Sequence, residues 1–290
     1  MSAVITGYAS LDYAMRLDRA PEPDRTATIL SRAAEFPRIG GSPVYVAAAM
    51  FAGGVRDATP VTWVGDDPQG QRYCDDLAAL GLSADGVSVR PGRTPVCILA
   101  YQPDGGCHCF YHPSLPEPLG LDDRQRALIA AADLVCVTVG PKSATRDALT
   151  LMRPDATLVW AVKADRRAVP PDLAAALAAR ADILVSSRGE AKFVHEAFMR
   201  GRGGERDALR IETRGGEGVA FSRGDGETML SAEPVEAGDT TGAGDTFLGG
   251  FLAAWGNGDV ERAVKSGMAA ARALLVRRAE AERRSLRHVE

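Results

Sequence analysis

The fold of this chain is decided by one stretch near its C-terminus, residues 235–251, which reads VEAGDTTGAGDTFLGGF. Gly242 and Gly244 cannot cover the backbone around them, so the amides there can approach a ligand closely. From Phe247 onward the apolar residues recur at helical spacing, which predicts that the loop opens into a helix. The first amides of a helix lack internal partners, and its dipole is positive at that end. The stretch therefore predicts a binding site for an anion such as phosphate.

Asp245 lies on the first turn of this helix, where an ionised carboxylate is favoured. A carboxylate that faces a bound phosphate can also accept a proton from an incoming hydroxyl group. A simpler interpretation is that Asp239 or Thr241 caps the helix while Asp245 only complements its dipole. Capping does not require two carboxylates around Thr-Thr-Gly-Ala-Gly, so we favour an anion loop with an adjacent base.

Composition places the chain among ordinary globular proteins. It has 290 residues, of which 46% are hydrophobic, and can bury a large core as one or two domains. Its formal net charge of -4 argues against a nucleic-acid partner, which would require a basic surface. The N-terminus lacks the features of a signal peptide, and no apolar run approaches the length of about 18 residues needed to span a membrane. We expect a cytoplasmic protein with no membrane partner.

The five cysteines raise the question of a metal site. Cys107-His108-Cys109 with His112 nearby could suggest zinc, but this spacing differs from that of the usual paired ligands. In a strand, Cys107 and Cys109 would point to one face and His108 to the other. This alternation favours a strand with reduced cysteines and no metal.

Short apolar runs alternate with helical patterns through most of the chain, which predicts an α/β fold with a largely parallel sheet. We expect buried strands at residues 3–7, 61–64, 134–139, 158–162 and 183–186 and a final antiparallel set at 209–213, 218–222 and 228–231. We expect helices at residues 44–51, 69–80, 144–152, 171–179, 190–198 and 260–278, besides the helix that begins after Gly242.

Two segments interrupt this alternation, residues 13–38 and 94–112. Both read as pairs of strands inserted into the main fold, and the second contains a Pro-Asp-Gly-Gly turn. They could be ordinary surface hairpins or a second, small sheet.

Two further features come before the anion loop. Asp12 follows the first predicted strand. Ligands of open α/β sheets bind near the carboxyl ends of the strands, so Asp12 is well placed to contact a ligand. The Asp12 carboxylate can accept hydrogen bonds from two hydroxyl groups. Gly40 and Gly41 precede a predicted helix and would let backbone amides approach a ligand.

The string AGDTTGAGDTFLGGF resembles the C-terminal signature of the ribokinase-like carbohydrate kinases, the PfkB family. The resemblance implies a single kinase domain over residues 1–290, with a three-layer fold, a mostly parallel central sheet and a small β-sheet lid formed by segments 13–38 and 94–112. It also implies a homodimer through the lid.

The implied activity is an ATP-dependent phosphotransferase with an alcohol group as acceptor. The acceptor would be the hydroxymethyl group of a sugar, sugar derivative or nucleoside, and Mg²⁺ would accompany ATP. Asp245 would be the general base, and the amides of Gly242, Ala243 and Gly244 would form the anion hole. An alternative is a catalytically inactive relative that binds a metabolite. A dinucleotide-dependent dehydrogenase is weaker, because no Gly-x-Gly-x-x-Gly follows the first strand.

The resemblance assigns further roles residue by residue. The acceptor would be bound by Asp12, Gly40, Gly41 and Tyr45, and ATP by Ser187, Thr213, Gly215, Gly218 and Met268. Glu190 would help to hold Mg²⁺ through water. Asp239 and Thr241 are candidate ligands for a monovalent cation such as K⁺. Tyr45 replaces an Asn that many members carry, so sugar and nucleoside acceptors both stay open.

Overall fold

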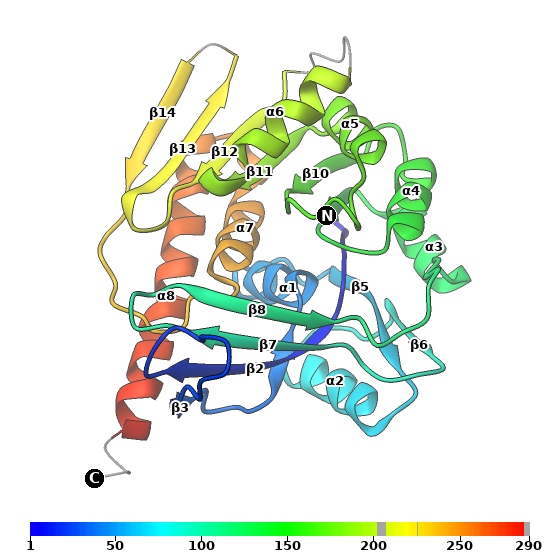
Figure 1. Cartoon of the computed structure of the whole chain (residues 1–290). Helices are drawn as coiled ribbons and strands as arrows, with labels where there is room; N and C mark the ends of the chain where they lie inside the picture. The colour runs from blue at the N-terminus through cyan, green and yellow to red at the C-terminus, as the bar shows by residue number, and fades with distance from the viewer. Residues whose placement is uncertain (202–206, 225, 287–290) are drawn as a thin grey trace.

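The computed structural model describes residues 1–201, 207–224 and 226–286, which form a three-layer α/β fold (Figure 1). Its central sheet has nine strands in the order β14-β13-β12-β11-β10-β9-β1-β5-β6. The strands from β12 to β6 pair in parallel, whereas β13 and β14 add an antiparallel edge. Their bounds are β1 (Ala3–Thr6), β5 (Ala58–Gly65), β6 (Val87–Arg90), β9 (Leu134–Val137), β10 (Thr157–Ala161), β11 (Ile183–Ser187), β12 (Leu209–Thr213), β13 (Gly218–Arg223) and β14 (Gly226–Ser231).

Helices cover both faces of this sheet. The helices are α1 (Ser42–Ala52), α2 (Pro68–Ala79), α3 (Asp123–Ala131), α4 (Lys142–Leu151), α5 (Pro171–Arg180), α6 (Ala191–Arg200), α7 (Ala243–Ala254) and α8 (Val260–Leu286). One core holds Ile5 of β1 together with α1, α2, α7 and α8, and the other holds Val4 together with α3 to α6. Neighbouring residues of one strand thus enter opposite cores, as the two-residue period of a strand requires.

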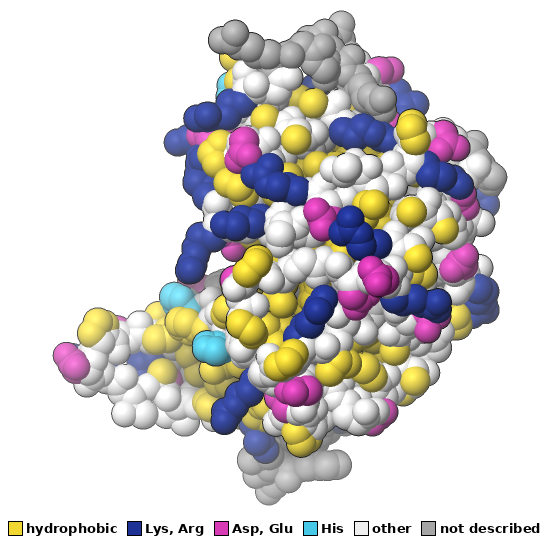
Figure 2. Space-filling model, turned by 90° about the vertical axis from the view of Figure 1, so that its right-hand side faces the viewer, with side chains coloured by type: hydrophobic (Ala, Val, Ile, Leu, Met, Phe, Trp, Pro, Cys, Tyr) yellow, Lys and Arg dark blue, Asp and Glu magenta, His cyan; other side chains and the backbone are white. Residues whose placement is uncertain are grey.

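A second, smaller sheet lies across the lower half of the molecule in Figure 1. It is built from β2 (Ser10–Leu17), β3 (Ile29–Arg32), β4 (Arg38–Gly40), β7 (Val96–Tyr101) and β8 (Cys107–His112). These strands fall in or beside the two segments that the sequence sets apart, and we call this sheet the lid. Figure 2 shows it projecting from the body of the molecule, with hydrophobic side chains along its surface.

The α/β class, the mostly parallel sheet and the small second sheet are confirmed. Four details differ from expectation: β6 and α3 were not predicted, α8 continues beyond residue 278, and Asp12 lies inside β2, a lid strand that begins at Ser10 instead of residue 13. Strand β6 has only four residues, too few for a periodic pattern to stand out.

Candidate active site

The anion loop enters α7 through a left-handed residue. Gly242 has φ 71° at the N-cap of the helix, a conformation that costs a residue with a side chain about 1–2 kcal/mol. Its Cα also packs on Tyr45 of α1, since a Cβ at this position would lie 2.8 Å from the aromatic ring. Glycine is therefore required at residue 242 by conformation and by space.

The loop presents unpaired donors at its tip. Ala243 donates its amide to Thr240 and Thr246 donates its amide to Gly242. Among the described residues, the amides of Gly244 and Asp245 have no hydrogen-bond acceptor. Two free N–H groups at the positive end of α7 form a site suited to a phosphoryl oxygen.

Asp245 stands beside these donors, on the first turn of α7. Burial raises the pKa of this carboxyl group above its usual value, although a hydrogen bond from Ser42 and the charge of Lys163 oppose the rise. The negative charges of Asp12 and Glu190 also raise it. Asp245 therefore lies within electrostatic reach of Asp12, predicted for the acceptor, and of Glu190, predicted for Mg²⁺.

Asp12 reaches the same region from the lid. Its buried carboxylate accepts a hydrogen bond from Ser10 at 2.6 Å and one from the Tyr45 hydroxyl group at 3.4 Å. Burial raises the pKa of Asp12, while its bond to Ser10 and the charge of Arg38 lower it. Gly40 packs on this carboxylate, because a Cβ there would lie 2.3 Å from it. The structure thus brings Asp12, Gly40 and Tyr45 together, although they come from three elements.

Gly41, between β4 and α1, has a conformational requirement of its own. Its φ is 95°, and a Cβ would lie 2.3 Å from the carbonyl oxygen of Tyr8. The backbone of the Gly-Gly pair therefore runs close to the end of β1, where the acceptor is expected.

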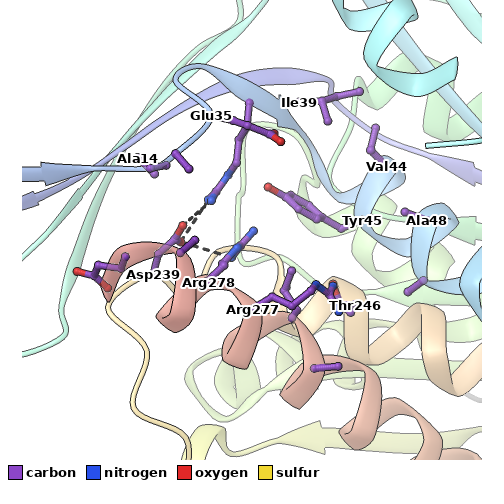
Figure 3. A pocket seen from close by; sticks show the side chains of 18 of the residues that line it. Ala14, Glu35, Ile39, Val44, Tyr45, Ala48, Asp239, Thr246, Arg277 and Arg278 are labelled. Carbon is purple, nitrogen blue, oxygen red and sulfur yellow. Dashed lines mark hydrogen bonds and ion pairs between the residues drawn. The ribbon is translucent and has the colours of Figure 1, made fainter. Parts of the chain in front are cut away.

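A buried ionic cluster at the start of the anion loop was not predicted (Figure 3). Arg38 donates two hydrogen bonds to Asp239, at 2.5 and 3.2 Å, and Arg278 of α8 lies 3.4 Å from the same carboxylate. Tyr101 donates to Asp239 at 2.8 Å and is hydrogen-bonded to Thr241. Although burial would raise the pKa of Asp239, the bonds from Arg38 and the charge of Arg278 lower it to about 2.

The available sequence signal for this cluster was weak. Arg38 lies two residues before Gly40 and is the register partner of Asp12 across β2 and β4. Arg278 has no neighbouring motif, and its approach to Asp239 depends on how α8 packs on α7.

The family comparison agrees with this geometry. The model of the pfkB family carbohydrate kinases matches residues 8–283. The chain belongs to this family. An ATP-dependent ribose-1-phosphate kinase of Halopiger xanaduensis is 32% identical over 262 residues, which cover 89% of this chain and 86% of that protein.

Solved structures of pfkB-type kinases share the fold. A nucleoside kinase of Burkholderia thailandensis, in complex with inosine, has a TM-score of 0.78 at 19% identity and covers 95% of this chain and 91% of its own. A ribokinase of Cryptococcus neoformans, in complex with ADP, has a TM-score of 0.78 at 20% identity and covers 100% and 99%. The chain is therefore a ribokinase-like carbohydrate kinase by family and by fold.

Four of the five residues predicted for ATP lie together, at the carboxyl ends of β11 and β12 and in the turn between β12 and β13. Ser187 and Thr213 are register partners at the carboxyl ends of β11 and β12. The turn after β12 contains Gly215 and Gly218, with φ 58° and 123°. Met268 of α8 instead packs against the core that α1, α7 and α8 share. The structure thus groups four of these five residues and shows Met268 in apolar packing.

Glu190 ends a short 3₁₀ turn, η1 (Arg188–Glu190), that follows β11. Its Oε2 accepts hydrogen bonds from the amide and the hydroxyl group of Ser187, at 2.8 and 2.9 Å. This capping arrangement holds Glu190 in place, and its other carboxylate oxygen has no hydrogen-bond partner in the described part of the chain.

The lid cysteines face the acceptor side of the fold. The sulfur atoms of Cys97 and Cys109 are 3.3 Å apart, and all five cysteines are free. The hydrogen bond between the two thiols lowers the pKa of Cys109 to about 7.

Among the described residues, no group of three His, Cys, Asp or Glu side chains could hold a metal ion. No helix in the described part of the chain has the length and apolar character needed to cross a bilayer.

Proposed function

We propose that this kinase transfers the γ-phosphoryl group of ATP to a hydroxymethyl group of a sugar, sugar derivative or nucleoside. The observation that carries the proposal is the arrangement on the first turn of α7. There the unpaired amides of Gly244 and Asp245 adjoin the Asp245 carboxylate. The amides would stabilise the transferring phosphoryl oxygens, while Asp245 accepts the proton of the acceptor hydroxyl group.

The same geometry suggests how the two substrates divide the site. ATP would lie against Ser187 and Thr213, with its γ-phosphate at the anion loop. Mg²⁺, when bound with ATP, would neutralise charge on the phosphates, and the free oxygen of Glu190 would hold it through water. Asp12 would accept hydrogen bonds from two acceptor hydroxyl groups and direct a third to Asp245.

We propose a sugar phosphate or a nucleoside as the acceptor, and sugar phosphates are the first class to test. The relative named as a ribose-1-phosphate kinase is 32% identical to this chain. Lys163 is exposed, and its charge acts on both Asp245 and Cys109 of the lid. A cation in this position could interact with an anionic substituent of the acceptor. The inosine complex of the B. thailandensis kinase keeps nucleosides in the panel.

The test measures ATP consumption with a panel of sugars, sugar phosphates and nucleosides, with and without Mg²⁺. Asp245→Asn should lower kcat by about 100- to 10,000-fold, because the proton acceptor is lost. Nucleotide binding and the melting temperature should stay near those of the wild type. Asp155→Asn is the matched control, since the Asp155 side chain is 77% exposed.

Two results would contradict this assignment. Turnover of Asp245→Asn within about threefold of the wild type would remove Asp245 as the base. Tight ATP binding without transfer to any acceptor would favour the inactive, metabolite-binding relative.

The cytoplasmic location stays a prediction. We also propose a homodimer that forms through the exposed face of the lid.

A further inference from the structure

The residues before the anion loop offer oxygen atoms of the kind that hold a monovalent cation. Potassium is bound in proteins by oxygens that replace its hydration shell. Asp239 supplies a carboxylate here, and Thr241 supplies a carbonyl and a hydroxyl oxygen. Whether these atoms fit a cation depends on what already contacts them.

Protein donors contact both carboxylate oxygens of Asp239 and the carbonyl oxygen of Thr241. Oδ2 of Asp239 accepts from Arg38, and Oδ1 accepts from Tyr101 at 2.8 Å and from the amide of Thr241 at 3.0 Å. The carbonyl oxygen of Thr241 accepts a hydrogen bond from Arg278, and its hydroxyl group is bonded to Tyr101. A cation that approached Asp239 or the Thr241 carbonyl would therefore compete with hydrogen bonds that are already made.

Charge opposes a metal ion further. Two guanidinium groups flank one carboxylate, and the side chains of Arg38, Arg278 and Asp239 are only 10%, 13% and 19% exposed. The cluster carries a net positive charge in a place where solvent screens little. A third cation entering it would meet repulsion from both guanidinium groups, which the single charge of Asp239 does not balance.

We propose that the guanidinium groups of Arg38 and Arg278 take the place of a monovalent cation at the base of the anion loop, so that phosphoryl transfer needs no such ion. This inference rests on the proposed kinase function. It replaces the expectation that Asp239 and Thr241 bind K⁺.

Arg278 acts on the loop through two contacts. It donates to the carbonyl of Thr241, the residue immediately before Gly242. Its guanidinium carbon also lies 5.7 Å from the ring centroid of Tyr45, and that ring packs on Gly242. Arg278 is thus a positioning residue that holds both Thr241 and the Tyr45 ring beside the loop and places positive charge there.

The first experiment uses the wild-type protein. Its turnover and its melting temperature are measured in about 100 mM potassium chloride and in tetramethylammonium chloride of equal ionic strength, so that screening is matched. We expect less than about twofold difference in rate and no potassium-specific stabilisation. Activation by potassium of about tenfold, or a melting temperature that rises only with potassium, would overturn the proposal.

The second experiment compares Arg278→Met with Arg277→Met. Arg277 is the adjacent residue of α8 and lines the cavity that Arg278 and Asp239 also line (Figure 3). Arg277 has no hydrogen-bond or ion-pair partner among the described residues. Arg278→Met should lower kcat by at least about tenfold, because the loop is misplaced, and potassium should restore part of the rate. Arg277→Met should leave the rate near that of the wild type. Equal rates for the two variants would also overturn the proposal.

The melting measurements separate this proposal from the proposed function. If no acceptor is phosphorylated, the kinase assignment fails, but the response of the melting temperature to potassium still reports whether the ion binds. That measurement needs only the folded wild-type chain, so a variant that does not fold leaves it intact.

Discussion

Replacement of Gly242 by alanine separates backbone strain from contact with Tyr45. Gly242 and Gly258 share φ 71°, so an alanine at either position meets the same left-handed penalty of about 1–2 kcal/mol. At Gly258 a Cβ would have no atom within 4 Å, whereas at Gly242 it would lie 2.8 Å from the Tyr45 ring. Carbon atoms pack at about 3.5–4.0 Å, so the ring or the loop must move by about 1 Å.

The expected effects follow from this difference. Overpacking of this kind costs about 1–3 kcal/mol, so Gly242→Ala should lose about 2–5 kcal/mol in total and Gly258→Ala about 1–2 kcal/mol. Thermal unfolding should resolve the difference, because 1 kcal/mol corresponds to about 2–4 °C in domains of comparable size. A displacement of about 1 Å in the anion loop should lower kcat by about 100-fold in Gly242→Ala alone.

A double variant tests the cause. With Tyr45→Leu in the background, Gly242→Ala should cost less stability than it does alone, because the ring that it displaces is gone. Equal melting temperatures and equal rates for Gly242→Ala and Gly258→Ala would refute the reasoning, since they would show that the ring does not confine the loop.

Two other predictions concern pH and assembly. Burial raises the pKa of Asp245, and the base acts only when it is ionised, so kcat/KM should fall as pH decreases through this raised pKa. The residual rate of Asp245→Asn should lack that dependence, and a wild-type profile with the same shape as that of Asp245→Asn would contradict the prediction. Ile98 and Phe110 are cross-strand partners on the lid and are 42% and 57% exposed, and the proposed dimer would bury them. Light scattering should therefore give the mass of two chains for the wild type and of one chain for Phe110→Glu. A wild-type mass of one chain would exclude the dimer.

The sequence predicted the layered fold because its main elements have strong local patterns. The helix after Gly242 is largely apolar, and strands such as β9 and β10 are short, mainly apolar runs. Strand β1 is fully buried and begins with three consecutive apolar residues. Such runs must be buried on both faces, and a parallel sheet between helices satisfies that requirement.

Asp12 shows where local patterns become insufficient. Its place near the carboxyl end of β1 was predicted, yet it lies in a strand of the lid that pairs with β4 and β7. The pairing that buries it joins residues far apart in the chain, and no local pattern specifies that partner. The same holds for Arg38 and Asp239, which are 201 residues apart.

The ionic cluster connects the two halves of the candidate site. Arg38 belongs to β4 of the lid and is the register partner of Asp12, whereas Asp239 belongs to the segment that leads into the anion loop. A displacement of β4 would therefore stretch the bond to Asp239 and, through Thr241, act on the loop. A change at Arg38 would therefore disturb the proposed acceptor site and the proposed phosphate site together. A change at an exposed position such as Lys163 is less constrained, so we expect acceptor preference to vary there first.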